Sequence, residues 1–136
     1  MLLVNNFTCP TNKSFVFDLY SVDKNFVFIN FWSTWCHFCV EELWDLQQLC
    51  KKYDMDVYFL FINCGESKTY VDAFLRQNNY NFIVGYDEEN ILSRKFDVMS
   101  IPRTILINDK HNIVEDIVGA KDFNGWEGVI TKYIKK

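Results

Sequence analysis

Short apolar runs separated by polar or amphipathic stretches set the pattern of this chain. Residues 25–32 (NFVFINFW) and 56–63 (DVYFLFIN) are apolar at almost every position, as strands are when both faces of a parallel sheet are covered. The runs at 103–108 and 113–118 flank the polar turn DKHN, which predicts a β-hairpin. Shorter strands are predicted at residues 14–18 and 82–86.

Helical spacing follows the first long run. Val40, Leu43 and Trp44 stand at i, i+3 and i+4, and the same spacing repeats down to Tyr53. This predicts a helix that starts just after Cys36, ends at about Tyr53 and turns these residues inward.

Three further helices are predicted downstream. Ser67 is a plausible N-cap for the first of them. A short helix is predicted at residues 88–96. Asn124, with Glu127 three residues later, has the spacing of a capping box at the start of the last helix.

The order of elements defines the fold class. Strands and helices alternate in the first half, which predicts parallel strands joined by crossover helices, and the closing hairpin adds antiparallel strands. We therefore expect an α/β fold with a mixed central sheet and helices on both faces, in a single domain spanning residues 1–136. Residues 1–13 are expected to form a loosely ordered N-terminal extension.

Composition narrows the function classes. The chain has 136 residues, 14 basic against 18 acidic, for a net charge of -4 and without a basic cluster, so nucleic acid is not an expected partner. No apolar run is long enough to cross a bilayer. The first ten residues lack the pattern of a signal peptide. We expect a cytoplasmic monomer if Met1 is the native start, and otherwise an exported protein that has lost a signal or anchor.

The cysteines carry the clearest chemistry. There are five, an odd number, which argues against a disulfide framework and fits a compartment that keeps thiols reduced. Two of them form the motif Cys36-His37-Phe38-Cys39, placed where a buried strand ends and a helix begins. Free N–H groups and the helix dipole at such a start stabilise a thiolate and lower the pKa of its thiol.

The spacing of Cys36 and Cys39 permits a reversible disulfide. Residues one helical turn apart have Cβ atoms about 5–6 Å apart, whereas a disulfide needs roughly 3.5–4.5 Å. A slight tightening of the first turn closes the bond. We expect Cys36 to attack a substrate disulfide, giving a mixed disulfide that Cys39 then breaks.

Three neighbours are candidates for tuning this pair. A protonated His37 would favour the Cys36 thiolate, and the alternative is a solvated side chain at a helix start. Phe38 is expected to supply apolar cover, and the alternative is an exposed loop aromatic. Glu42 follows Cys39 by three residues on the same helical face, where a carboxylate could shuttle the proton of that thiol and would raise its pKa. A solvated glutamate is the alternative.

A metal site is the main competing reading of the motif. Structural zinc sites use four ligands, often as two close pairs, and this chain has one C-x-x-C without a second. The other cysteines are isolated, and Cys50 and Cys64 fall on predicted buried faces. We therefore expect no metal, and we expect the pair to be more than two inert thiols.

Two segments resemble the thioredoxin superfamily. NFWSTWCHFC resembles its active-site segment, with Trp35 directly before the first cysteine, and FDVMSIPRTILIND resembles its cis-proline loop and the strand that follows. The resemblance implies a thioredoxin-like three-layer α/β/α sandwich and a cis bond between Ile101 and Pro102. In the family this loop faces the cysteines and its backbone pairs with substrate peptide, and this role is carried over to Ile101 and Pro102 only. Trp35, directly before Cys36, is also expected to bind substrate.

Within the superfamily the chain is most similar to the TlpA/ResA-like branch. Asn30 stands where that branch has asparagine and classical thioredoxins have aspartate, and Glu42 completes the branch's C-x-x-C-x-x-E pattern. Trp44 stands where the branch commonly has proline, and His37-Phe38 is neither Gly-Pro nor Pro-Pro. We expect Asn30, His37 and Phe38 to modulate the cysteine pair.

The resemblance implies a function. It is that of a thiol-disulfide oxidoreductase, an enzyme that reduces protein disulfides with its own cysteine pair and no other cofactor. Its partners would be protein thiols and disulfides and an unidentified thiol electron donor. The alternatives are a non-catalytic binding module of the same fold and a peroxidase, whose differently placed single cysteine is not seen here.

Overall fold

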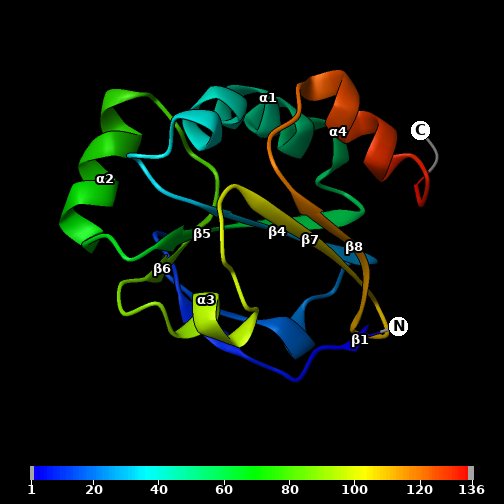
Figure 1. Ribbon diagram of the computed structural model, residues 1–136. Helices are drawn as coiled ribbons and strands as arrows, with labels where there is room; N and C mark the ends of the chain where they lie inside the picture. The colour runs from blue at the N-terminus through cyan, green and yellow to red at the C-terminus, as the bar shows by residue number, and fades with distance from the viewer. Residues whose placement is uncertain (1, 135–136) are drawn as a thin grey trace.

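The computed structural model describes residues 2–134 and arranges them in three layers (Figure 1). A six-stranded sheet in the order β1-β8-β7-β4-β5-β6 forms the middle layer, and β2 and β3 form a separate two-stranded ribbon. The strands are β1 (Leu2–Leu3), β2 (Thr8–Pro10), β3 (Val16–Asp18), β4 (Phe26–Trp32), β5 (Val57–Cys64), β6 (Val84–Asp87), β7 (Arg103–Asn108) and β8 (Asn112–Val118). The helices are α1 (His37–Tyr53), α2 (Lys68–Gln77), α3 (Ile91–Lys95) and α4 (Phe123–Ile130), with a 3-10 turn at Leu19–Ser21.

Strand β4 lies at the centre of the sheet and makes it mixed, as the sequence predicts. It pairs in parallel with β5 and antiparallel with β7. The register places Asn30 next to Thr104 of β7 on one side and Phe61 of β5 on the other. The carboxyl ends of the parallel strands β4, β5 and β6 therefore meet at one edge, where open α/β sheets place their functional groups.

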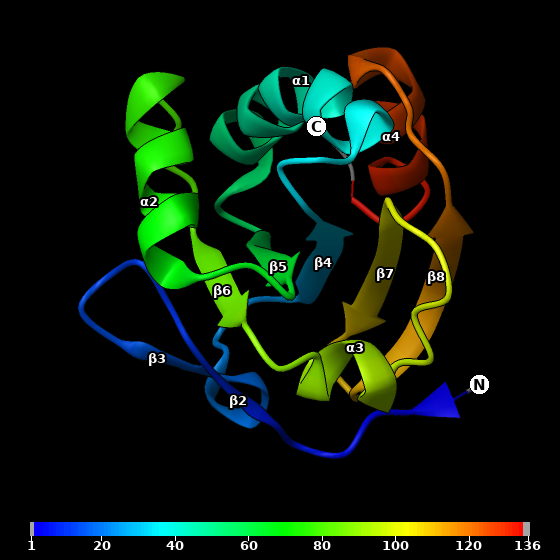
Figure 2. The same cartoon turned by 60° about the vertical axis from the view of Figure 1, so that its left-hand side comes forward.

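Helices cover both faces of the sheet, again as predicted. Helices α1, α2 and α4 lie on one face, and α3 lies with the β2–β3 ribbon on the other (Figures 1 and 2). Successive residues of β4 point to opposite faces, so Phe28 belongs to the core under α1 and Ile29 to the core under α3. The two cores hold the sheet, and hence the start of α1, in place.

The expectation of a loosely ordered N-terminal extension is wrong for the described residues 2–13. Strand β1 pairs with β8, with Leu2 opposite Ile113, and β2 pairs with β3. Val4, Phe7 and Cys9 are buried in the core on the α3 side. The segment is ordered because these apolar side chains cover the α3 face of the sheet, but their spacing has no periodicity that sequence reasoning could use.

Two local expectations also differ from the structure. The helical spacing predicts an inward-facing Trp44, yet this residue is 56% exposed, because it shares the solvent face of α1 with Glu41 and Lys51. The N-cap of α4 is Asp122, whose side chain accepts a hydrogen bond from Gly125 N at 2.8 Å, and Asn124 lies inside the helix. Within residues 2–134 the structure contains no helix with the length and apolar character needed to span a membrane.

Candidate active site

The cysteine pair lies at the start of α1, shortly after the end of β4. Cys36 is the N-cap of α1, with extended backbone (φ -86°, ψ 106°), and its sulfur accepts a hydrogen bond from Cys39 N at 3.3 Å. The two cysteines form a disulfide, with Cα atoms 5.2 Å apart. The helix start predicted from the sequence is therefore confirmed, and Cys36 Sγ occupies the position where the helix N-terminus favours negative charge.

The two cysteines differ in exposure. Cys36 is 6% exposed, whereas Cys39 is fully buried. Of the two cysteines, Cys36 is therefore the one that a molecule in solution can contact. This asymmetry agrees with the expected order of attack and resolution.

The cis-proline loop forms the opposite wall of the site. The Ile101–Pro102 bond is cis, as predicted, and Ile101 O lies 3.7 Å from Cys36 Sγ although 65 residues separate them. Trp35 is 72% exposed beside this loop. The structure thus brings all three residues assigned to substrate binding to the cysteine pair.

A cleft of about 580 Å³ opens next to this wall. Trp35, Met99, Ile101, Cys64 and Ser93 are among the residues that line it. Sequence analysis assigns no role to Met99, although it lies two residues before Ile101 in the predicted cis-proline loop. Burial raises the pKa of the Cys64 thiol to about 11, which keeps that thiol protonated and unreactive at neutral pH.

The residues between the cysteines lie on the surface. His37 Nε2 pairs with Glu41 Oε2 at 3.0 Å, one turn along α1. Phe38 is exposed and meets the His37 ring edge-on. With 63% of its surface exposed, Phe38 matches the alternative of an exposed aromatic better than the expected apolar cover. The modulating roles of His37 and Phe38 remain predictions.

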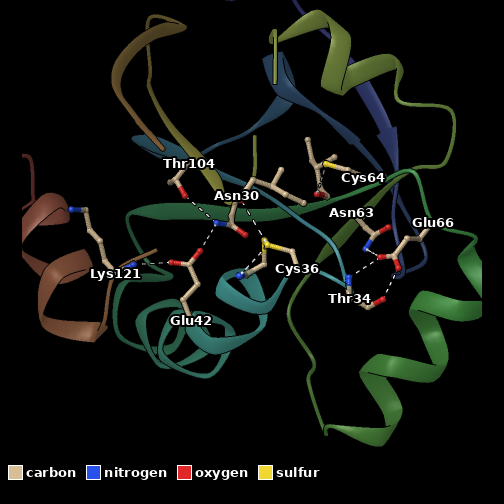
Figure 3. Close-up of a disulfide and its surroundings, with 12 residues drawn as sticks. Asn30, Thr34, Cys36, Glu42, Asn63, Cys64, Glu66, Thr104 and Lys121 are labelled. Atoms are coloured by element: carbon tan, nitrogen blue, oxygen red, sulfur yellow. Dashed lines mark hydrogen bonds between the residues drawn. A yellow bond between two sulfur atoms is a disulfide. The ribbon is translucent and has the colours of Figure 1, made fainter. Parts of the chain in front are cut away.

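Glu42 is buried in the hydrogen-bonded centre of the site (Figure 3). Its Oε1 accepts hydrogen bonds from Lys121 N at 3.1 Å and Trp126 Nε1 at 2.9 Å, and its Oε2 accepts one from Asn30 Nδ2 at 3.3 Å. Burial raises the pKa of Glu42 to about 7, and the three donors limit the rise. The reading of Glu42 as a solvated helix residue is wrong, because α4 and the segment before it cover this carboxylate.

Asn30 links Glu42 to the neighbouring strand. The same Nδ2 that donates to Glu42 also donates to Thr104 Oγ1 at 3.0 Å. This is possible because Asn30 and Thr104 are paired across β4 and β7. A neutral amide at this buried position can donate to a carboxylate, whereas an aspartate would repel it.

A second carboxylate holds the loop before the cysteines, and sequence reasoning missed it. Glu66, after β5, accepts hydrogen bonds from Thr34 N and Asn63 Nδ2, both at 2.8 Å, and from the Thr34 hydroxyl (Figure 3). No sequence pattern links Glu66 to Thr34, because the contact depends on the pairing of β4 with β5. As for metals, residues 2–134 contain no cluster of three or more His, Cys, Asp or Glu side chains arranged to hold an ion.

A mixed sheet between two helical layers, with a cysteine pair at a helix start and a cis-proline loop against it, defines a thioredoxin-fold protein. The sequence profile of the AhpC/TSA family matches residues 3–116, and the chain belongs to this family.

Curated relatives agree with the predicted branch. The thiol-disulfide oxidoreductase ResA of Bacillus subtilis (strain 168) is 34% identical over 95 residues, which are 69% of this chain and 53% of that protein. A ResA of Bacillus cereus is 30% identical over 107 residues, 78% of this chain and 62% of that protein. The similarity to ResA-like proteins is thereby confirmed. The chain spans little more than half the length of these relatives.

Solved structures show the same fold. StoA from Bacillus subtilis superposes with a TM-score of 0.81 at 20% identity, covering 91% of this chain and 95% of its own. The exposed lipoprotein thioredoxin Etrx1 from Streptococcus pneumoniae strain TIGR4 gives a TM-score of 0.84 at 19% identity, covering 94% and 99%. These similarities support the predicted thioredoxin-like sandwich.

Proposed function

We propose that this protein is a thiol-disulfide oxidoreductase that reduces protein disulfides through Cys36 and Cys39. The observation that carries the proposal is the disulfide at the start of α1, with one accessible sulfur facing Ile101 O and one enclosed sulfur behind it. The relatives that this chain matches over part of their length are named thiol-disulfide oxidoreductases, and these names support the same activity.

The reaction has two steps. The Cys36 thiolate of the reduced protein attacks one sulfur of a substrate disulfide, forming a mixed disulfide and releasing the other substrate sulfur as a thiolate. The Cys39 thiolate then attacks Cys36 Sγ, which closes the internal disulfide and releases the second substrate thiolate. The substrate gains two electrons, and the protein loses two.

Each cycle has to return these electrons to the protein. We propose that a dithiol partner reduces the internal disulfide by the same exchange run in reverse, because Cys36 is the sulfur that a partner can reach. The substrate class follows from the wall of the site, where the backbone beside Ile101 lies next to Cys36 and can pair with an extended peptide.

Glu42 supplies a route for the Cys39 proton. Cys39 has to lose its proton before it can attack Cys36, and its burial keeps bulk water away. Glu42 lies one helical turn beyond Cys39, also buried, and its pKa of about 7 lets it accept or release a proton near neutral pH. We propose that it acts as the general base for the resolving step.

A trapping experiment tests the function. Cys39→Ser should accumulate mixed disulfides between Cys36 and substrate proteins that a reductant releases, and Cys36→Ser should accumulate none. Cys50→Ser is the matched control, since Cys50 lies on the same helix but outside the site, and it should reduce insulin like the unaltered protein. Absence of a trapped species from Cys39→Ser, with insulin left unreduced by the unaltered protein, would sink the proposal.

A binding module of the same fold is the second candidate. The exposed apolar side chains of Trp35, Phe38 and Met99 around the pair favour it, because they could dock a partner without any redox step. Redox titration against glutathione separates the two functions. A reversible two-electron couple between Cys36 and Cys39 supports the oxidoreductase, and its absence supports the binding module.

A further inference from the structure

Glu66 lies in the loop between β5 and α2, and its carboxylate points at the loop that leads into the cysteine pair (Figure 3). Thr34 N donates to Glu66 Oε1 at 2.8 Å, and the Thr34 hydroxyl donates to Oε2. Asn63 Nδ2 donates to Oε1 at 2.8 Å. Both carboxylate oxygens are therefore occupied by donors from the ends of two neighbouring strands.

Burial and backbone hydrogen bonding hold the chain on either side of position 65, just before Glu66, in place. Asn63 is fully buried at the end of β5, and Gly65 N donates to Asp87 O at 3.0 Å. Gly65 has φ +74°, a conformation open to glycine, and a Cβ there would lie 3.1 Å from the Asn90 side-chain amide. This tight turn is what lets the chain reverse and direct Glu66 back toward Thr34.

The Thr34 side controls the reactive sulfur. Thr34 lies two residues before Cys36, and Cys36 N donates to Ser33 O at 3.4 Å, so residues 33–36 form a turn. Within the described residues 2–134, Thr34 is the one residue of this turn whose side chain donates a hydrogen bond to Glu66. Fixing Thr34 therefore fixes the turn, and with it Cys36 as the N-cap of α1 and Trp35 beside the cleft.

We propose that Glu66 is a positioning residue for Cys36, acting through Thr34. The inference rests on the proposed oxidoreductase function and adds a residue to it. Glu66 holds the turn so that the Cys36 sulfur stays where Cys39 N and the helix N-terminus stabilise its thiolate. Without the tether the turn gains alternative conformations, and the thiolate loses part of this stabilisation.

A simple charge effect makes the opposite prediction. If Glu66 acted only as a negative charge near Cys36, its removal would favour the thiolate, and alanine and glutamine at position 66 would both speed the reaction. Positioning predicts that Glu66→Ala slows Cys36. Glu66→Gln should keep its rate, because a glutamine can still accept from Thr34 N and Asn63 through its oxygen and donate to the Thr34 hydroxyl.

The test is alkylation of Cys36 in the reduced protein by iodoacetamide between pH 5 and 9. Mass spectrometry of the peptide that contains Cys36 measures the rate. Glu66→Ala should slow the reaction at pH 7 about tenfold, which corresponds to a pKa of the thiol higher by about one. Glu66→Gln should stay within about twofold of the unaltered protein. Glu88→Ala is the matched control. Glu88 accepts a hydrogen bond from Lys68 N at the start of α2 but none from residues 33–36, so the alkylation rate of Cys36 should not change in this variant.

Thr34 gives a second, smaller perturbation if Glu66→Ala unfolds. Thr34→Val removes the hydroxyl at constant volume and should slow Cys36, whereas Thr34→Ser keeps the hydroxyl and should restore the rate. Equal rates for Thr34→Val and Thr34→Ser, or faster alkylation in both Glu66 variants, would overturn the inference. Because alkylation needs no substrate protein, these outcomes stand apart from failure of the proposed function, which would appear as the absence of a redox couple in the unaltered protein.

Discussion

The indole nitrogen of Trp126 donates a hydrogen bond of 2.9 Å to Glu42, 84 residues earlier in the chain. The backbone nitrogen of Lys121 donates to the same oxygen. Two of the three donors to this buried carboxylate therefore come from α4 and the segment before it. Burial favours the protonated form of Glu42 and each donor favours the ionised form, so the packing of α4 on α1 sets where the carboxylate titrates.

Trp126→Phe should raise the pKa of Glu42 further. The substitution keeps an aromatic ring in the core but removes the indole N–H, and a hydrogen bond to a charged group contributes roughly 1.5–3 kcal/mol. The expected rise is about one pH unit or more, measured from the infrared band of the protonated carboxyl during a pH titration. Trp35→Phe, outside the Glu42 pocket, is the control and should leave the titration unchanged. An unaltered midpoint in Trp126→Phe would show that the indole does not stabilise the carboxylate.

Glu42→Gln should lower the pKa of Cys39 and make the protein a weaker reductant. The substitution removes a negative charge one helical turn from the buried thiol, so the dithiolate form becomes less unfavourable. A tenfold change in the thiol–disulfide equilibrium corresponds to about 30 mV, and we expect the reduction potential to rise by that order. Equilibration with glutathione at pH 7 measures the potential. The same potential in both proteins, together with the same Cys39 titration, would refute the proposed role of Glu42.

Glu42 should also make the stability of the protein depend on pH. Its pKa is about 7 in the folded chain against 4.5 for an unburied glutamate, so the folded state binds more protons than the unfolded state between these values. The free energy of unfolding should therefore be highest for this group below pH 4.5, fall as the pH rises toward 7, and level off above it. The loss is on the order of 3 kcal/mol.

Urea unfolding of the oxidised protein at several pH values, compared with Glu42→Gln, isolates this contribution. Other groups titrate in both proteins, so the difference between the two curves belongs to Glu42. A difference that does not change between pH 4.5 and about 8 would mean that the buried carboxylate titrates like an exposed one.

Trp35 and Trp44 form a matched pair for testing the substrate wall. Both are exposed tryptophans, but Trp35 lines the cleft beside Ile101 and Trp44 lies on the solvent face of α1. Trp35→Ala should raise KM for a peptide disulfide about tenfold, the equivalent of about 1.4 kcal/mol of lost contact, with little change in kcat. Trp44→Ala should change neither constant. Equal effects of the two substitutions would remove Trp35 from the substrate site.

The cap of α4 can be tested by stability alone. Asp122→Ala removes the side chain that accepts from Gly125 N and should lower the free energy of unfolding by about 1 kcal/mol. Asn124→Ala replaces a residue inside the helix and should have no such cost, since alanine is the better helix former. Urea unfolding midpoints measure the stability of both variants. A larger loss of stability in Asn124→Ala than in Asp122→Ala would indicate that Asn124 is the N-cap, as predicted from the sequence.

Most of the fold follows from patterns that are local in the sequence. Strands β4 and β5 can be predicted from their apolar runs, because a strand buried on both faces is apolar at nearly every position. Helix α1 can be predicted from the spacing of Leu43, Leu46 and Leu49, because a helix buried along one stripe is apolar at every third or fourth position. The ordered N-terminal segment has no such pattern. Val4 and Phe7 are buried by tertiary packing, and two- or three-residue strands have no period to detect.

The site divides in the same way. Cys36, Cys39 and Glu42 fall within one motif, and the loop at Pro102 has a recognisable pattern of its own. Glu66 and the donors to Glu42 from Lys121 and Trp126 could not be predicted, since each depends on which strands pair and which helix covers which face. Spacing alone also could not choose between Asp122 and Asn124, because both are good N-cap residues and the choice depends on where the chain enters α4.

Within the described residues 2–134, strand β1 pairs with the outer edge of β8 at Asn112 and Ile113. The rest of that edge carries Glu115 and Asp116, which form ion pairs with Lys132 and Arg103. A strand from another chain adding here would have to strip water from two adjacent carboxylates and disturb both pairs. Charged side chains on a sheet edge oppose such extension, so Glu115 and Asp116 make this stretch of β8 a poor site for pairing with a second copy of the chain.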